Sequence, residues 1–93
     1  MTLPSDDLDL RRRRAAYRAH HRGTKEMDWL MGKFADARLA AMDGAALARF
    51  EELIALPDPE LQKWILEGLD IKGSDLADLV GELRRFHGIG GTT

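Results

Sequence analysis

Arginine side chains recur at helical spacing in the first quarter of the chain. Arg11, Arg14, Arg18 and Arg22 fall within about one quadrant of a helix at roughly 100° per residue, and His21 lies beside them. Guanidinium groups bind carboxylates, phosphates and carbonyl oxygens through paired hydrogen bonds. The spacing therefore predicts a surface that binds such groups, with a solvated helix face as the alternative for a charge run.

A tight turn is predicted at the end of this stripe, in Arg22-Gly23-Thr24-Lys25-Glu26. Gly23 stands where a left-handed residue would close one helix, and Thr24 can cap the next. The turn sets a cation and a carboxylate, Arg22 and Glu26, on either side of the glycine. From spacing alone, a local Arg22–Glu26 ion pair worth about 0.5 kcal/mol is the simpler explanation of these two charges.

Patterns for catalysis and for metal binding are missing from the sequence. The chain has no cysteine, and it contains no Ser/His/Asp order, P-loop or Gly-rich dinucleotide fingerprint. His20, His21 and His87 lack metal-ligand spacing with carboxylates. We therefore predict no catalytic residue, no metal site and no enzyme.

The chain is short and its charge is unevenly distributed. Its 93 residues are enough for one small domain, and its net charge is −2. Residues 1–25 carry seven Arg or Lys against three Asp, whereas residues 26–93 carry seven against thirteen acidic residues. The acidic body argues against a nucleic-acid partner. We expect a flexible leader at residues 1–8, one helical domain at 9–87 and a flexible tail at 88–93.

Nothing in the sequence predicts insertion into a membrane. The longest apolar runs span four residues, such as 39–42, whereas a membrane span needs about 20. The acidic start of the chain resembles neither a signal peptide nor a transit peptide. We expect a cytoplasmic protein.

Helical periodicity predicts an all-α fold, a compact bundle of five short helices. The first is expected from about Asp9 to Arg22. Apolar stripes mark the buried faces of the next two helices: Met27, Leu30, Met31, Phe34 and Ala35, then Leu47, Phe50, Leu53 and Ile54. Asp43 is expected to cap the third helix, and Pro57 to end it.

Two further helices complete the predicted bundle. Asp58-Pro59 is a start signal for the fourth, with Asp58 as its cap and Gly68 or Gly73 as its end. Ser74-Asp75 is expected to start the fifth. The inward residues are Leu61, Trp64 and Ile65, then Leu76, Leu79, Val80, Leu83 and Phe86. Trp29 lies off its helix's apolar stripe, as half-buried packing or as an exposed anchor.

Two segments carry a family resemblance. The run His21-Arg22-Gly23-Thr24-Lys25-Glu26-Met27-Asp28 resembles the Arg-Gly-x-x-Glu signature of the small flavinylation factors of succinate dehydrogenase. These are called succinate dehydrogenase assembly factor 2 in mitochondria and SdhE in bacteria. Asp58-Pro59-Glu60-Leu61-Gln62-Lys63-Trp64 resembles the family's Asp-Pro-x-Leu-x-x-Trp segment. The similarity covers roughly residues 11–86, and the family's five-helix fold agrees with the predicted one.

The resemblance implies an assembly factor of the bacterial type that binds the flavoprotein subunit of succinate dehydrogenase, and in some bacteria that of fumarate reductase. It implies promotion of covalent FAD attachment to a histidine of this client, with no cofactor of the factor's own. Arg22, Gly23 and Glu26 carry over as client-binding residues. Many members have arginine where this chain has His21, so the role of a paired arginine is not carried over. We add a supporting interface from the surrounding polar residues: Arg11, Arg14, Arg18, His21, Lys25 and Asp28.

Two other functions use the same arginine-rich first helix. One is a small helical nucleic-acid-binding module, against which the acidic body and the low aromatic content count. The other is a generic helical adaptor for an unrelated partner. The sequence does not define the range of flavoprotein clients, direct contact with FAD, or the oligomeric state.

Overall fold

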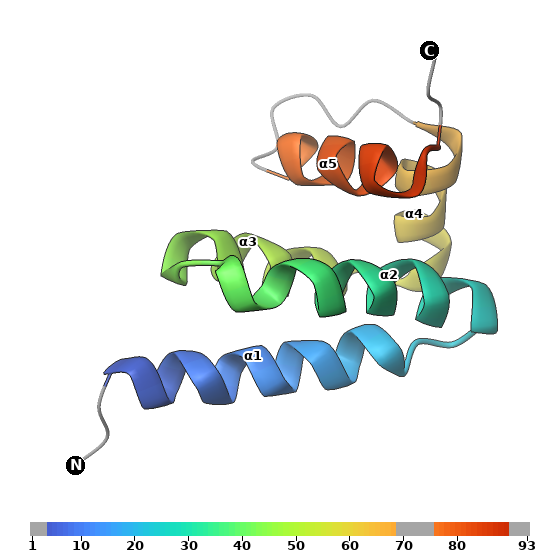
Figure 1. The fold of residues 1–93 in the computed structure, drawn as a ribbon. Coiled ribbons are helices and arrows are strands. Elements are labelled where there is room, and N and C mark those ends of the chain that lie inside the picture. Colours follow the sequence, from blue (N-terminus) through green and yellow to red (C-terminus); the bar gives the residue numbers. More distant parts are fainter. Residues whose placement is uncertain (1–3, 69–75, 90–93) are drawn as a thin grey trace.

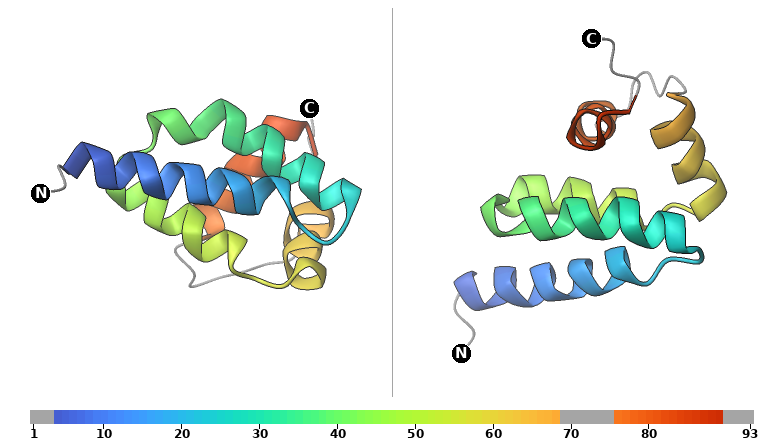
Figure 2. Two further views of the ribbon diagram at one scale, coloured as in Figure 1. Left: turned by 90° about the horizontal axis from the view of Figure 1, so that it is seen from below. Right: turned by 45° about the vertical axis from the view of Figure 1, so that its right-hand side comes forward.

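The computed structural model describes residues 4–68 and 76–89, and within them the chain is helical, without a β-strand. The predicted all-α fold of five helices is confirmed. Figure 1 shows three layers: α1 on one side, α2 and α3 in the middle, and α5 on the other side, with α4 at one end. The view turned by 45° in Figure 2 shows the same layers. The helices are α1 (Pro4–His20), α2 (Lys25–Arg38), α3 (Gly44–Ile54), α4 (Asp58–Gln62) and α5 (Ala77–His87).

The first helix is longer at its start and shorter at its end than predicted. It begins at Pro4 rather than Asp9, so residues 4–8 are helical and do not belong to an irregular leader. Proline suits this position because its φ is preset for a helix and a first-turn amide has no intrahelical acceptor. The helix ends at His20, which places Arg22 beyond it. Residues 1–3 lie outside the described part of the chain.

The caps of the middle helices agree with prediction. Thr24 Oγ1 accepts a hydrogen bond from the amide of Met27, which caps α2. Asp43 Oδ1 accepts one from the amide of Ala46, which caps α3. A short 3₁₀ turn, η1 (Leu39–Ala41), joins the two helices. The third helix ends at Ile54, three residues before the proline that was expected to stop it.

The core lies between the middle layer and the two outer helices. The predicted apolar stripes of α2 and α3 are buried, and Phe34 packs against Phe50 and Phe86 at ring-centroid distances of 6.0 and 5.5 Å. Among the described side chains of α1, only those of Ala15 and Ala19 are fully buried in this core. Such small residues let α1 pack closely on the middle layer, and the partly buried Leu8 packs against the same core.

The C-terminal half departs from prediction at the start of α4. Asp58 does not cap this helix with its side chain, since Pro57 is the N-cap residue and no side-chain cap bond is made there. A π-helical turn, η2 (Lys63–Glu67), follows, and Gly68 ends it with a φ of 67°. Of the predicted inward residues, Leu61 and Ile65 are buried and Trp64 is partly buried.

The last helix also ends on a left-handed glycine, Gly88, with a φ of 69°. Leu79, Val80 and Leu83 are buried as predicted, and Phe86 is partly buried. The alternative helix end at Gly73, the predicted start at Ser74-Asp75 and the tail at residues 90–93 lie outside the described residues.

Candidate functional site

The turn between α1 and α2 is clamped to the turn between α3 and α4 by Arg22 and Asp58. Arg22 Nε donates to Asp58 Oδ1 at 2.8 Å, and the amide of Gly23 donates to Asp58 Oδ2 at 2.7 Å. The two Arg22 Nη atoms donate to the carbonyls of Ile54 and Leu56, the latter at 2.7 Å. Both charged side chains are mostly buried, 10% exposed for Arg22 and 19% for Asp58. We call these contacts the Asp58 clamp.

The clamp accounts for the Arg22 guanidinium within the chain. The simple Arg22–Glu26 ion pair is therefore wrong, because Arg22 pairs with a residue 36 positions away. The Glu26 carboxylate is exposed and makes no hydrogen bond or ion pair within residues 4–68 and 76–89. Of the two charges of the signature, Arg22 holds the turn in place and Glu26 is the one presented to solvent.

Gly23 is required by close packing and not by its backbone conformation. The predicted left-handed geometry is wrong, since only Gly68 and Gly88 have a positive φ among the described residues. A Cβ atom built on Gly23 would lie 2.9 Å from Asp58 Oδ2. Any side chain at this position must therefore displace the carboxylate that accepts the Gly23 amide.

Asp28 completes the turn from the other side. Its Oδ1 accepts a hydrogen bond from the backbone amide of Arg22, so this predicted interface residue orders the turn as well. Asp28 is partly buried, whereas Gly23, Lys25 and Glu26 are exposed. The Lys25 ammonium has no hydrogen-bond partner in the part of the chain that the structure describes. The three exposed residues form one outward surface on a turn whose backbone is fixed by two aspartates.

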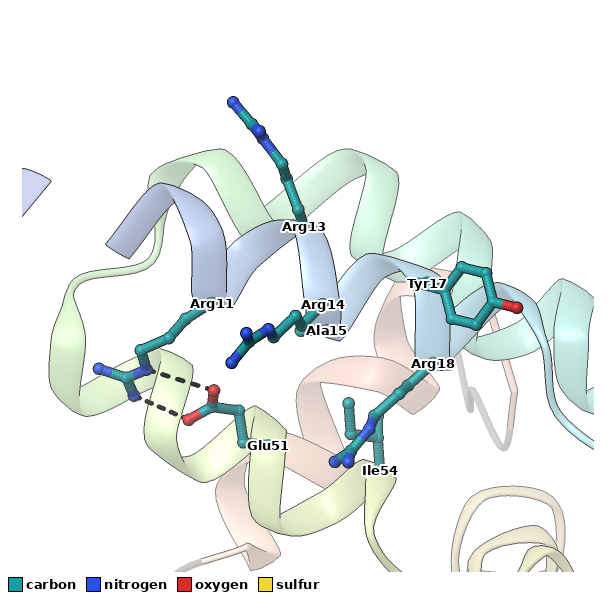
Figure 3. Close-up of a pocket in the computed structure, with 8 residues that line it drawn as sticks. All are labelled: Arg11, Arg13, Arg14, Ala15, Tyr17, Arg18, Glu51 and Ile54. Atoms are coloured by element: carbon teal, nitrogen blue, oxygen red, sulfur yellow. Dashed lines mark hydrogen bonds and ion pairs between the residues drawn. The ribbon is translucent and has the colours of Figure 1, made fainter. Parts of the chain in front are cut away.

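The arginines of α1 do not form one uniform stripe. Arg11 makes a two-pronged pair with Glu51 on α3, with Nε at 3.2 Å and Nη2 at 2.7 Å from the carboxylate oxygens (Figure 3). Arg14 and Arg18 are exposed, and neither has an ion-pair partner among the described residues. The structure thus separates a paired Arg11 and a clamped Arg22 from Arg14 and Arg18, of which Arg18 still helps to lower the pKa of the Glu51 carboxyl.

His21 and Tyr17 stack on each other beside these cations. Their ring centroids are 4.0 Å apart, and His21 Nδ1 lies 2.8 Å from the carbonyl oxygen of Tyr17. His21 is exposed, as a supporting interface residue should be. The predicted supporting interface therefore divides, with Lys25 on the turn of residues 22–26, here called the motif turn, Arg14 and Arg18 on α1, and His21 directly after α1.

The Arg11–Glu51 pair shifts both partners toward their charged forms. Hydrogen bonding to Arg11 lowers the pKa of Glu51 below its usual value of 4.5, and the bond to Glu51 raises the pKa of Arg11. A carboxylate with a lowered folded-state pKa stabilises the fold above its unfolded-state pKa, and this contribution is lost as the pH falls through the folded-state value. The pair therefore contributes at neutral pH and ceases to contribute in acid.

We expect Glu51→Gln to lower the free energy of unfolding at pH 7, because Arg11 loses its carboxylate. The difference from the wild type should shrink as the pH falls from 4.5 through the lower folded-state pKa of Glu51. Urea unfolding at several pH values measures this. Glu52→Gln is the matched control, since Glu52 is exposed and unpaired within the described residues. Equal, pH-independent effects of the two substitutions would contradict the prediction.

Two residues near the turn between α1 and α2, Asp58 and Trp29, were not predicted as site residues from the sequence. Asp58 was read as a helix cap, and its link to Arg22 has no local signal because the two are far apart in sequence. Trp29 has 52% of its surface accessible, so its indole is both packed and exposed. Its ring centroid lies 4.8 Å from that of His87, whose Nε2 is 2.7 Å from the Leu30 carbonyl oxygen. The exposed indole extends the outward surface along α2.

The described residues carry neither a metal-ligand cluster nor a membrane-spanning helix. No group of three His, Asp or Glu side chains within residues 4–68 and 76–89 is placed to hold a metal ion. None of the helices described is long and apolar enough to cross a bilayer. What the chain offers chemically is a set of hydrogen-bonding and charged groups on a fixed turn.

Comparison with known proteins gives one consistent result. A family model described as flavinator of succinate dehydrogenase matches residues 13–87. The chain is 42% identical over 69 residues to the FAD assembly factor SdhE of Acetobacter pasteurianus, covering 74% of this chain and 63% of that protein. It is 32% identical over 85 residues to the FAD assembly factor SdhE of Acinetobacter baylyi, covering 90% and 99%.

A more distant match is the mitochondrial succinate dehydrogenase assembly factor 2 of Dictyostelium discoideum, 28% identical over 65 residues. This match covers 70% of the chain but 46% of that protein, so the chain spans about half the length of its mitochondrial relative. No solved structure matches the chain.

Proposed function

The chain belongs to the family of flavinators of succinate dehydrogenase, and from this membership we propose that it binds the flavoprotein subunit of succinate dehydrogenase and promotes covalent attachment of FAD to a histidine of that subunit. The resemblance carried by the Arg-Gly-x-x-Glu and Asp-Pro segments is thereby confirmed. Relatives carry the name assembly factor, so the chain assists an enzyme and is not one itself. FAD belongs to the client in this proposal, and the factor holds no cofactor of its own.

The ordered turn is the observation that supports this proposal most directly. Arg22, Asp28 and Asp58 fix the backbone around Gly23, so the exposed turn is already shaped before a client arrives. A preorganised surface loses little conformational entropy on binding. Gly23 lets a client backbone approach closely, and the free Glu26 carboxylate accepts hydrogen bonds from it.

Flavinylation is promoted by positioning in this proposal. The client histidine and the flavin must be held together for the covalent bond to form, and correct placement alone supplies a large part of a rate enhancement. A factor that binds one arrangement of the client's domains more tightly than others raises the population of that arrangement. The factor's own side chains then bind and orient, while the client and FAD supply the reacting atoms.

Co-expression with the flavoprotein subunit tests the proposal. Covalent flavin is read as in-gel fluorescence after denaturing electrophoresis, with and without this protein. Equal covalent flavin in both samples would overturn the proposed function. The fumarate reductase flavoprotein, tested in the same way, decides whether it is a second client. We place the reaction in the bacterial cytoplasm.

Removing the Glu26 charge is expected to weaken client binding without unfolding the protein. Glu26→Gln should raise the Kd for the flavoprotein about 10- to 100-fold, because hydrogen bonds to a charged group contribute about 1.5–3 kcal/mol. Calorimetric titration of the purified flavoprotein measures this. Glu52→Gln removes an exposed charge elsewhere and should leave the Kd within about twofold. A Glu26→Gln protein that binds as tightly as the control would exclude Glu26 from the interface.

A further inference from the structure

A groove runs between α1 and α3 and ends at the start of the motif turn. One part has a volume of about 490 Å³ and is lined by Arg14, Arg18, Tyr17, Ala15, Ile54 and Glu51 among others. An adjoining hollow of about 400 Å³ shares Tyr17, Arg18 and Ile54 and reaches His21 and Arg22. We call the continuous depression the arginine groove. It leads from the Arg11–Glu51 pair to the Asp58 clamp.

The groove carries positive charge that its own carboxylate does not neutralise. Glu51 pairs with Arg11 and also interacts electrostatically with Arg18, but it is the one carboxylate among four lining arginines. Figure 3 shows Arg14 and Arg18 extending from α1 toward the groove, and Arg13 also lines it. Arg14 and Arg18 are one helical turn apart, and like charges at this spacing destabilise a helix by about 0.2–0.5 kcal/mol. A bound group with two negative charges would relieve this repulsion.

The spacing of the two cations selects the shape of that group. Four residues of helix advance about 6 Å. Alternate residues of an extended chain place their side chains on one face, about 6.6 Å apart. Two carboxylates separated by one residue therefore match Arg14 and Arg18. The buried side chains of Ala15 and Ile54 line the groove between the helices, and the exposed Tyr17 ring lies beside it.

We propose that the arginine groove binds an extended acidic segment of the client flavoprotein, in which two Asp or Glu residues flank one other residue. This inference rests on the proposed function for the identity of the client. The segment occupies a surface that neither Gly23 nor Glu26 contributes to, so the client is held at two places. The second contact fixes how the client is oriented on the motif turn.

A protein segment fits the groove better than nucleic acid does. The basic lining of this groove is short, its far end carries the ionised Glu51, and its lining includes Ala15 and Ile54. A duplex backbone presents charges along its whole length and needs a longer basic track to be held. The acidic body of the chain opposes such an extended contact.

A photo-cross-linking residue at position 17 tests the proposal. Tyr17 is 65% exposed beside the groove, and p-benzoylphenylalanine keeps an aromatic ring there. The full-length protein is irradiated with the flavoprotein subunit, and the cross-linked client peptide is sequenced by mass spectrometry. We expect a peptide with two acidic residues separated by one. A cross-link to a client segment without acidic residues would overturn the proposal.

Matched charge variants distinguish binding in the groove from nonspecific electrostatic attraction between the two proteins. Arg14→Gln/Arg18→Gln should lower the cross-linking yield about tenfold. Arg49→Gln/Arg85→Gln removes the same charge from exposed arginines that do not line the groove and should lower the yield less than about twofold. Equal loss in both double variants would overturn the proposal. So would a random DNA duplex that displaces the client at 0.15 M salt, which would assign the groove to nucleic acid.

The cross-linking result is independent of the test of the proposed function. Normal, factor-dependent flavinylation without a cross-link at position 17 overturns the groove proposal and leaves the function intact. Covalent flavin that does not depend on the factor overturns the proposed function itself. The two failures are read in different experiments.

Discussion

Replacing Gly23 with arginine is expected to reduce covalent flavin on the co-expressed client to the level seen without the factor. The Cβ atom alone would lie 2.9 Å from Asp58 Oδ2, so the carboxylate must move and the Gly23 amide loses its acceptor. The guanidinium would then project from an exposed turn into the space that the proposed complex gives to the client backbone. In-gel flavin fluorescence of the client measures the loss.

Gly23→Ala separates the two effects of this substitution. Alanine displaces Asp58 in the same way but adds no bulk beyond Cβ, so it should cost about 1–2 kcal/mol of stability and reduce flavinylation only in part. Circular dichroism should show that both variants keep their helices. Normal flavinylation by the Gly23→Arg protein would mean that the turn does not contact the client.

Replacing Asp58 with alanine is expected to lower the free energy of unfolding by about 2–4 kcal/mol. The substitution leaves the Arg22 guanidinium mostly buried without its counter-charge and removes the acceptor of the Gly23 amide. Breaking one partner of a buried ion pair is strongly destabilising because the other charge stays buried. Urea unfolding monitored by circular dichroism measures the change.

Glu60→Ala is the matched control for Asp58→Ala. It lies in the same helix and is exposed, so its effect should stay within about 0.5 kcal/mol. Combining Asp58→Ala with Arg22→Met should recover part of the loss, because no charge is then left unpaired. An Asp58→Ala protein as stable as the control would contradict the role assigned to the clamp.

Local sequence signals were sufficient for most of the fold. The apolar stripe from Met27 to Ala35 and the caps at Thr24 and Asp43 were predicted from spacing and side-chain chemistry, and the structure confirms them. The start of α1 was missed because Asp6 and Asp7 looked like part of an irregular leader. Acidic residues in a first turn are in fact favourable to a helix, since they face the positive end of its dipole.

The internal organisation of the site could not be read from the sequence. Asp58 has the residue type and the Pro59 neighbour of a helix cap, and nothing local indicates a partner 36 residues earlier. The local pattern also made Gly23 look like a left-handed residue at the end of a helix. Position 23 requires glycine instead because the distant Asp58 carboxylate lies so close to it. The roles of Gly23 and Asp58 depend on a contact between residues far apart in the chain. Such a contact cannot be inferred from a single sequence.

The Asp58 clamp also makes the motif turn conditional on a finished fold. The signature is complete once residue 26 has been synthesised, but its acceptor arrives only with residue 58 and is positioned only after α3 has packed. A nascent or truncated chain that displays the signature therefore lacks the shaped turn. Under the proposed function, competence to bind the client therefore requires the folded chain, and we expect incomplete copies not to compete with complete ones for the flavoprotein.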